Sequence, residues 1–137
     1  MLELVSPTPA DGAPEGGYTD AETKAMQRAV LRLFEHWDIS DVDAAIILGG
    51  IAPRTVGRWR AGDLGRANRD LADRMSLLLG IHKALRIIFE EPQRGYRWIK
   101  APNDAFGGRS ALDVMRQGGM ADIARLRHYL DWVRGGW

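Results

Sequence analysis

The sequence predicts an all-α fold made of two small helical modules in one chain. Apolar residues recur at spacings of three and four, as they do on the buried face of amphipathic helices. Residues that cap helices stand before these stripes, and glycine or proline stands after them. Hydrophobic residues make up 45% of the 137 residues, which is enough for a packed core.

Residues 1–18 are expected to form a flexible tail. The stretch contains three prolines and three glycines and has too few bulky apolar residues to order itself by burial. A plain disordered leader and an arm that docks onto a partner both fit this composition. We therefore place the start of the folded part at residue 19.

The first helix is predicted to begin after Thr19. With Thr19 as the N-cap, Glu22 occupies the third helical position and completes a capping box, although Asp20 is an alternative N-cap. An apolar stripe follows at Met26, Ala29, Val30, Leu33, Phe34 and Trp37. We interpret this stripe as the core-facing side of the helix, with a dimerisation face as the alternative.

The next part of the chain has the pattern of two helices joined by a glycine turn. Ser40 is suited to cap the first helix, and Gly49-Gly50 ends it. Pro53 fits the first turn of the next helix, in which Val56 and Trp59 are spaced to point inward together. This arrangement predicts a helix-turn-helix, whose second helix enters the major groove of DNA.

The outward side of the second helix carries the candidate DNA contacts. These side chains are Arg54, Thr55, Arg58 and Arg60. Arginine can fork onto guanine, and threonine can contact phosphate. The net charge of the chain is only +1, but residues 50–70 hold five arginines against two aspartates. For the arginines alone, a solvated helix face is the alternative.

The segment from Leu48 to Trp59 resembles the helix-turn-helix of Xre/Cro-like repressors. Those repressors usually have a single glycine after the leucine and a small residue four positions before that glycine. Because two glycines follow Leu48 here, we expect Ala45 to fill the small-residue position with a lengthened turn; a different register is the alternative. We assign residues 19–66 to an Xre-like helix-turn-helix module.

Residues 67–137 are predicted to form a second helical module. Asn68 is suited to cap its first helix. The apolar stripe of this helix runs through Leu71, Met75, Leu78, His82, Leu85 and Phe89. We expect Gly80 to divide the segment into two helices, and we interpret His82 as a core or boundary residue because no partner for it is evident.

A last amphipathic helix is predicted to end near Gly135. Trp132 and Trp137 do not fit its apolar stripe. Tryptophan is rarely exposed without a function and is enriched in interfaces. The two tryptophans therefore either fold back on their own domain or mark a binding surface.

A non-repetitive stretch precedes this last helix. Asn103 is a turn former, and Gly107-Gly108 permits positive φ and close approach of the backbone. Ser110 can cap a short helix through Val114 or Met115. The stretch is a shaped surface element, and it contains no catalytic constellation.

From about residue 85 to residue 137 the chain resembles the C-terminal toxin-binding domain of the MbcA/ParS/Xre antitoxins. The positions that carry the resemblance are Trp98, Pro102-Asn103, Phe106-Gly107-Gly108, Leu112-Asp113, Gly119, Ile123, Leu130 and Gly135. Two features depart from the family. Ala111 stands where the family usually has proline, and the chain ends with Gly135-Gly136-Trp137.

The resemblance implies an antitoxin of a type II toxin–antitoxin system. Its expected partner is a RES-domain toxin that acts on NAD⁺ by ADP-ribosyl transfer or phosphorolysis, and the antitoxin is expected to cover the NAD-binding cleft with its C-terminal region. The residues that we assign to the toxin-binding surface are Trp98, Asn103, Phe106, Gly107, Gly108, Trp132, Arg134 and Trp137. The helix-turn-helix implies autorepression at operator DNA, as a homodimer or in a 2:2 complex with the toxin.

Other functional classes lack support in the sequence. There is no cysteine, the three histidines lack metal-ligand spacing, and no nucleophile has a base beside it. We therefore expect no enzyme, no metal and no cofactor. No signal peptide and no run of ~18 apolar residues is evident, so we expect a cytoplasmic protein. The alternative function is a stand-alone helix-turn-helix regulator whose C-terminal module dimerises.

Overall fold

The computed structural model describes residues 17–135, which contain helices and turns and no strand. The helices are α1 (Asp20–His36), α2 (Asp41–Ile47), α3 (Pro53–Arg60), α4 (Arg69–Ile88), α5 (Pro92–Trp98), the 3₁₀ turn η1 (Asp104–Phe106), α6 (Ala111–Met115) and α7 (Met120–Val133). The predicted all-α fold class is confirmed. All but the last two residues of the predicted tail, and Trp137, lie outside the described residues.

Side-chain caps start α1, α2, α4 and α6 where the sequence places them. Thr19 and Glu22 form the predicted capping box of α1. The backbone N of Thr19 lies 2.8 Å from Glu22 Oε1, and the backbone N of Glu22 lies 3.0 Å from Thr19 Oγ1. Ser40 caps α2, and Asn68 caps α4. Ser110 caps α6, which ends at Met115, by accepting a hydrogen bond from the N–H of Asp113 at 3.0 Å, because Asp113 is the third helical residue.

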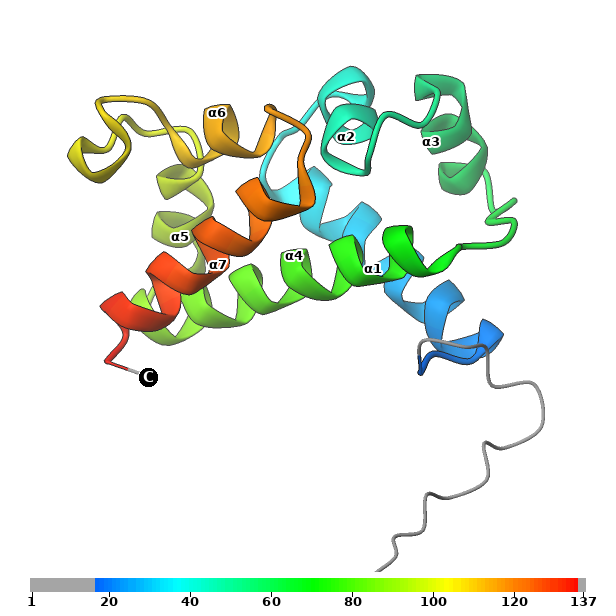
Figure 1. Ribbon diagram of the computed structural model, residues 1–137, viewed down its shortest axis with the longest axis horizontal. Coiled ribbons are helices and arrows are strands. Elements are labelled where there is room, and N and C mark those ends of the chain that lie inside the picture. The colour runs from blue at the N-terminus through cyan, green and yellow to red at the C-terminus, as the bar shows by residue number, and fades with distance from the viewer. Residues whose placement is uncertain (1–16, 136–137) are drawn as a thin grey trace, which may run out of the picture.

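The long helix α4 is the element against which α1, α5 and α7 pack (Figure 1). Our expectation that Gly80 divides it is wrong, since α4 continues without a break from Arg69 to Ile88. One glycine costs a helix only about 1 kcal/mol, and the buried side chains of Leu78 and Ile81 hold both sides of it. The glycine makes room for Arg127 of α7, whose guanidinium a Cβ at this position would strike.

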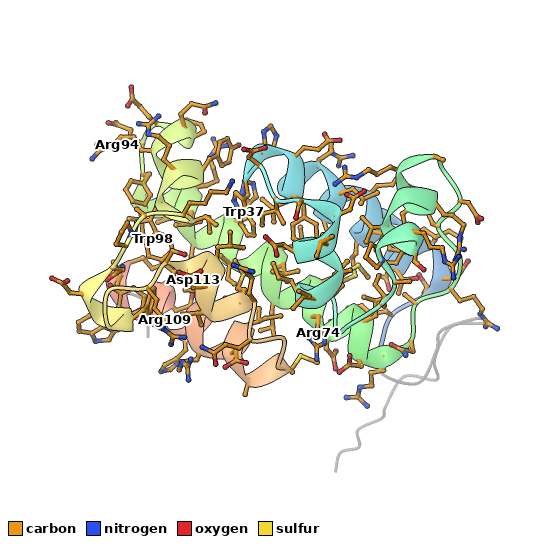
Figure 2. The ribbon with its side chains drawn as sticks, turned by 90° about the horizontal axis from the view of Figure 1, so that it is seen from above. Trp37, Arg74, Arg94, Trp98, Arg109 and Asp113 are labelled. Atoms are coloured by element: carbon orange, nitrogen blue, oxygen red, sulfur yellow. The ribbon has the colours of Figure 1, made fainter. Side chains whose placement is uncertain are left out.

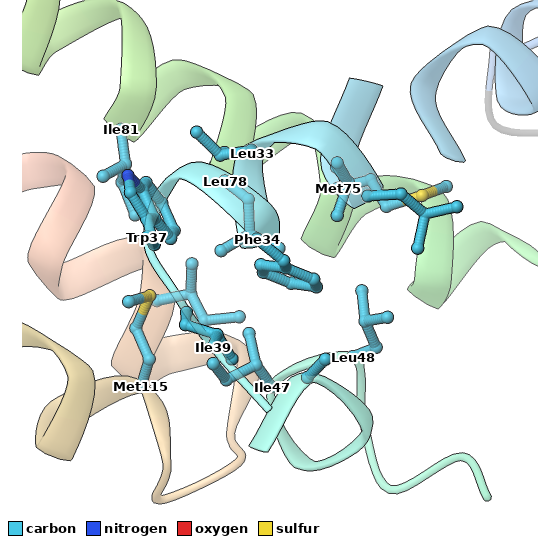
Figure 3. Close-up of a cluster of buried hydrophobic side chains, with 14 of the residues drawn as sticks. Leu33, Phe34, Trp37, Ile39, Ile47, Leu48, Met75, Leu78, Ile81 and Met115 are labelled. Atoms are coloured by element: carbon cyan, nitrogen blue, oxygen red, sulfur yellow. The ribbon is translucent and has the colours of Figure 1, made fainter. Parts of the chain in front are cut away.

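A single hydrophobic core runs through both halves of the chain (Figure 3). Phe34 of α1 and Trp37, the C-cap residue of that helix, are almost fully buried, with 0% and 1% of their surfaces exposed. They share this core with Ile81 of α4 and with Met115 of α6, which are also fully buried. The helix-turn-helix and the C-terminal helices are therefore packed against a common centre.

Arg74 is a charged residue within this packed structure, with 8% of its surface exposed (Figure 2). Its Nε donates to the Asp70 carboxylate at 2.9 Å, and its Nη1 donates to the carbonyls of Ile47 at 3.2 Å and Gly118 at 2.8 Å. Its guanidinium also lies 3.1 Å from the position that a Cβ on Gly49 would take. Arg74 thereby joins α4 to the end of α2 and to the turn before α7.

We expect Arg74→Met to lower the free energy of unfolding by about 1–3 kcal/mol, because it removes the charged donor from two carbonyl groups and leaves them buried. Urea unfolding followed by circular dichroism would measure this. Arg69→Met is the matched control, since Arg69 is on the same helix and its side chain is 67% exposed. Equal stability of the two variants would contradict the bridging role of Arg74.

Candidate functional site

Helices α2 and α3 form the helix-turn-helix that the sequence predicts. The turn between them contains Gly49 and Gly50 in the left-handed region, at φ values of 103° and 88°. Val56 and Trp59 of α3 are buried, with 0% and 4% exposed, as expected from their spacing. Ala45 is buried as well, which suits a small-residue position before a lengthened turn. The inner side of α3 is thus fixed, and its other side faces solvent.

The candidate DNA contacts do not all lie in the same environment. Arg54 and Arg58 are exposed, and Arg58 lies 3.4 Å from the Thr55 hydroxyl. Thr55, Arg58 and Arg66 line an open groove of about 680 Å³ between α3 and the start of α4. Arg60 instead forms ion pairs with Glu35 at 3.2 Å and Asp41 at 2.9 Å, which tie α3 to α1 and α2. A contact between Arg60 and DNA would require these ion pairs to open.

At the other end of the chain, four aromatic side chains meet, and we call them the aromatic cluster: Trp98, Phe106, Tyr129 and Trp132. The Trp98 ring is stacked with Tyr129 at a centroid distance of 6.5 Å, and Phe106 meets Tyr129 edge-on at 5.1 Å. Trp132 lies 6.5 Å from Tyr129 and is 72% exposed. The cluster thus combines half-buried rings with one exposed indole.

The loop that holds Phe106 in this cluster is built by Asn103. Its side chain accepts a hydrogen bond from the N–H of Ala105 at 2.8 Å, and its carbonyl accepts one from Gly108 at 2.9 Å. Its own N–H donates to the carbonyl of Arg109 at 3.0 Å, which closes the loop. Gly107 and Gly108 have φ values of 68° and 87°, which other residues rarely adopt. The loop is therefore held in shape by hydrogen bonds among its own residues and by its two glycines.

The helix after this loop is fixed by the pairing of Ser110 with Asp113. Hydrogen bonding from Ser110, chiefly from its backbone N–H, holds the pKa of the Asp113 carboxyl below its usual value. Ala111, where the resemblance led us to note a missing proline, is the first residue of α6 and is fully buried. Proline suits that helical position, so either residue is compatible with the backbone here.

Comparison with known proteins matches both halves of the chain to antitoxin domains. Residues 17–80 match the antitoxin Xre-like helix-turn-helix domain. Residues 84–136 match the antitoxin Xre/MbcA/ParS C-terminal toxin-binding domain. The chain belongs to the Xre/MbcA/ParS antitoxin family. The two matched regions of this antitoxin meet within α4, and our division after residue 66 stays a prediction.

An uncharacterized protein named y4oB from Sinorhizobium fredii is similar to this antitoxin. The two are 41% identical over 116 residues, which is 85% of this chain and 89% of the relative. Antitoxin helix-turn-helix and toxin-binding domains are typically non-enzymatic. A toxin-binding domain implies a toxin as partner, and the helix-turn-helix suggests DNA binding.

The structure of the antitoxin brings together most of the residues that we assigned to toxin binding, but not all. Trp98, Phe106 and Trp132 meet in the aromatic cluster. Arg134, next to the end of α7, lies 3.6 Å from the Asp131 carboxylate. Trp137 lies outside the described residues, so its position in this surface stays a prediction.

Sequence analysis missed Tyr129, which contacts the other three rings of the aromatic cluster. A signal was present, because Tyr129 stands three positions before Trp132 and so shares its side of α7. Among residues 17–135, no three acidic or histidine side chains gather as a metal site would require. None of the helices described here is long and apolar enough to cross a membrane.

The aromatic cluster predicts different roles for its two residues on α7. Tyr129→Ala should lower the free energy of unfolding by about 2 kcal/mol, because three ring contacts are lost. Trp132→Ala should change it by less than about 0.5 kcal/mol, because most of this side chain is already in solvent. Urea unfolding of both variants would test this, and a large loss for Trp132→Ala would show that the indole belongs to the fold.

Proposed function

We propose that this antitoxin neutralises a RES-domain toxin by covering its NAD-binding cleft with the C-terminal region, and that it represses its own operon. The identity of the toxin rests on the resemblance of residues 85–137 to the antitoxin family. The toxin would act on NAD⁺ by ADP-ribosyl transfer or by phosphorolysis. Both partners in this proposal, the toxin and operator DNA, place the antitoxin in the cytoplasm.

The observation that carries the proposal is the exposed indole of Trp132 on the aromatic cluster. Large aromatic side chains that stand out from a rigid support are typical anchors of protein interfaces. Trp132 is 72% exposed, whereas the other rings of the cluster are held by α5, by the Asn103 loop and by α7. This surface supports docking with little ordering cost, because its parts are in place before the partner binds.

Neutralisation in this proposal is steric. The toxin-binding surface comprises Trp98, Asn103, Phe106, Gly107, Gly108, Trp132, Arg134 and Trp137. Arg134 directly follows α7 and so lies close to Trp132 in the chain. In this proposal the segment that starts at Arg134 enters the NAD-binding cleft of the toxin. The ion pair of Arg134 with Asp131 is partly exposed and therefore weak, which leaves Arg134 available to a carboxylate or phosphate-like group of the toxin.

We expect deletion of residues 134–137 to abolish neutralisation while the protein stays folded. Co-expression with the product of the neighbouring reading frame, followed by growth and NAD⁺ assays, would measure neutralisation, and thermal unfolding would check the fold. The single substitution Arg134→Ala should also weaken neutralisation, because it removes the charged group offered to the toxin. Arg125→Ala is its matched control, since both arginines are on or next to α7 and the Arg125 side chain is 60% exposed.

Full neutralisation by the truncated chain would contradict the cleft-covering proposal. If growth is rescued but the product of the neighbouring reading frame changes neither NAD⁺ nor the ADP-ribosylation of any macromolecule, the antitoxin role would stand and the RES-domain toxin would be rejected as its partner. Size-exclusion chromatography of the complex would distinguish a 2:2 assembly from others. If the protein forms no complex and the product of the neighbouring reading frame is not toxic, the results would instead favour the stand-alone regulator.

The second part of the proposal assigns α3 to the major groove of operator DNA. Arg54 and Arg58 are exposed on its outer side, and Thr55 lies between them to contact phosphate. Arg60 belongs to this surface only if DNA replaces its partners Glu35 and Asp41. A dimer on two half-sites about one helical turn apart is expected, because one helix-turn-helix reads few base pairs.

We expect Arg54→Ala and Arg58→Ala each to weaken specific DNA binding by about 1–3 kcal/mol, because each would remove a forked contact to guanine. Gel-shift titrations at one fixed salt concentration with the operon's promoter would measure this. Arg125→Ala removes an exposed arginine of α7 and should leave the affinity unchanged. If the α3 variants bind with unchanged affinity, these arginines belong to a solvated helix face and do not contact bases.

A further inference from the structure

A pocket of about 250 Å³ lies between α1, α4 and α5. None of its lining residues belongs to α3 or to the aromatic cluster. Its polar lining consists of Arg32, His36, His82, Arg86 and Tyr96, and none of the eight described lining residues carries a carboxylate. The pocket is therefore a cationic hollow that neither proposed partner surface uses.

Ring stacking holds the two histidines of this pocket in place. The His36 ring is stacked on Tyr96 at a centroid distance of 4.8 Å and an interplanar angle of 9°. The His82 ring is also nearly parallel to Tyr96, at 6.4 Å and 15°. Two imidazoles from different helices thus stand on a common support, and each can donate a hydrogen bond when it is protonated.

Neither arginine of the pocket forms an ion pair in the described part of the chain. Arg60, Arg74, Arg116 and Arg127 all form ion pairs with aspartate or glutamate there, whereas neither Arg32 nor Arg86 does so. The pKa of His82 is lowered by burial and further by the nearby charges of Arg86 and His36. The fixed charge of the lining is therefore that of two arginines, with no carboxylate among the described lining residues.

We infer that this pocket binds the phosphate group of a small molecule, either free phosphate or a phosphomonoester. Arginine is the side chain best suited to phosphate, because its guanidinium presents paired donors. Two arginines with two imidazoles match a dianion better than a singly charged carboxylate. The volume fits a phosphate group and a small attached part rather than a drug-sized ligand.

Binding at this pocket would join the two halves of the antitoxin. Arg32 and His36 come from α1 of the helix-turn-helix domain, and Arg86 and Tyr96 come from α4 and α5 within the toxin-binding domain. A ligand that contacts both would stabilise the folded state in proportion to its concentration. Thermal stability is therefore a direct readout that needs neither toxin nor DNA.

The first test is the midpoint of thermal unfolding of the full chain at pH 6.5. We expect about 3 °C or more of stabilisation in 50 mM sodium phosphate over sodium chloride of equal ionic strength. The variant Arg32→Gln/Arg86→Gln should lose this increase. Lys83→Gln should keep it, because Lys83 is an exposed cation of α4 outside the pocket lining. Equal midpoints in phosphate and chloride would overturn the proposal.

A second arm replaces inorganic phosphate with adenosine monophosphate. Stabilisation at a lower concentration of the nucleotide would identify a phosphomonoester as the ligand, and stabilisation by inorganic phosphate alone would identify free phosphate. An increase that survives in Arg32→Gln/Arg86→Gln would mean that phosphate acts elsewhere and would reject this pocket.

Histidine titration by NMR tests the same site independently. The groups that face His82 are Arg32 and His36 from α1, Arg86 from its own helix and Tyr96 from α5. A bound dianion favours the protonated imidazole, so phosphate should raise the pKa of His82. His128, which is exposed on α7, serves as the internal control and should not move. An equal change in the pKa values of His82 and His128 would contradict specific binding at this pocket.

Discussion

The buried guanidinium of Arg74 is the contact on which the arrangement of the two domains depends. It is placed by α4 and donates to a carbonyl at the end of α2 and to another in the turn before α7. A charge can be buried there only because both carbonyls and Asp70 accept its hydrogen bonds. The absence of a side chain on Gly49 lets the guanidinium reach this position, which ties the helix-turn-helix to the C-terminal domain.

Other contacts also join the two domains. Arg116, at the end of α6, forms a 3.0 Å ion pair with Asp43 of α2, and Gly118 packs against Ile46. Lys100 donates to the carbonyl of Asp38 at 2.6 Å. The C-terminal domain thus contacts both α2 and the turn before it. The helix that supports α3 and the loop that supports Phe106 are therefore parts of one packed body.

Most of the fold could be predicted from the sequence, because its determinants are local. The caps at Thr19, Ser40 and Asn68 act on backbone groups three positions away, and the apolar stripes repeat within four. The inward spacing of Val56 and Trp59 gave the orientation of α3 for the same reason. The prediction that Gly80 divides α4 was wrong because this glycine accommodates Arg127 from a helix distant in the sequence.

The candidate site was predicted less completely, because it depends on residues far apart in the chain. Local pattern identified the Asn103 loop and singled out Trp132 as lying off the apolar stripe. Local pattern places Tyr129 on the same side of α7 as Trp132, but it could not reveal that Tyr129 contacts Trp98 and Phe106. It also could not reveal that Arg60 is held by Glu35, or that Arg32 and Arg86 face one pocket. Arg74 shows the reason, since its partner carbonyl on Gly118 is 44 positions away and no periodicity encodes such a contact.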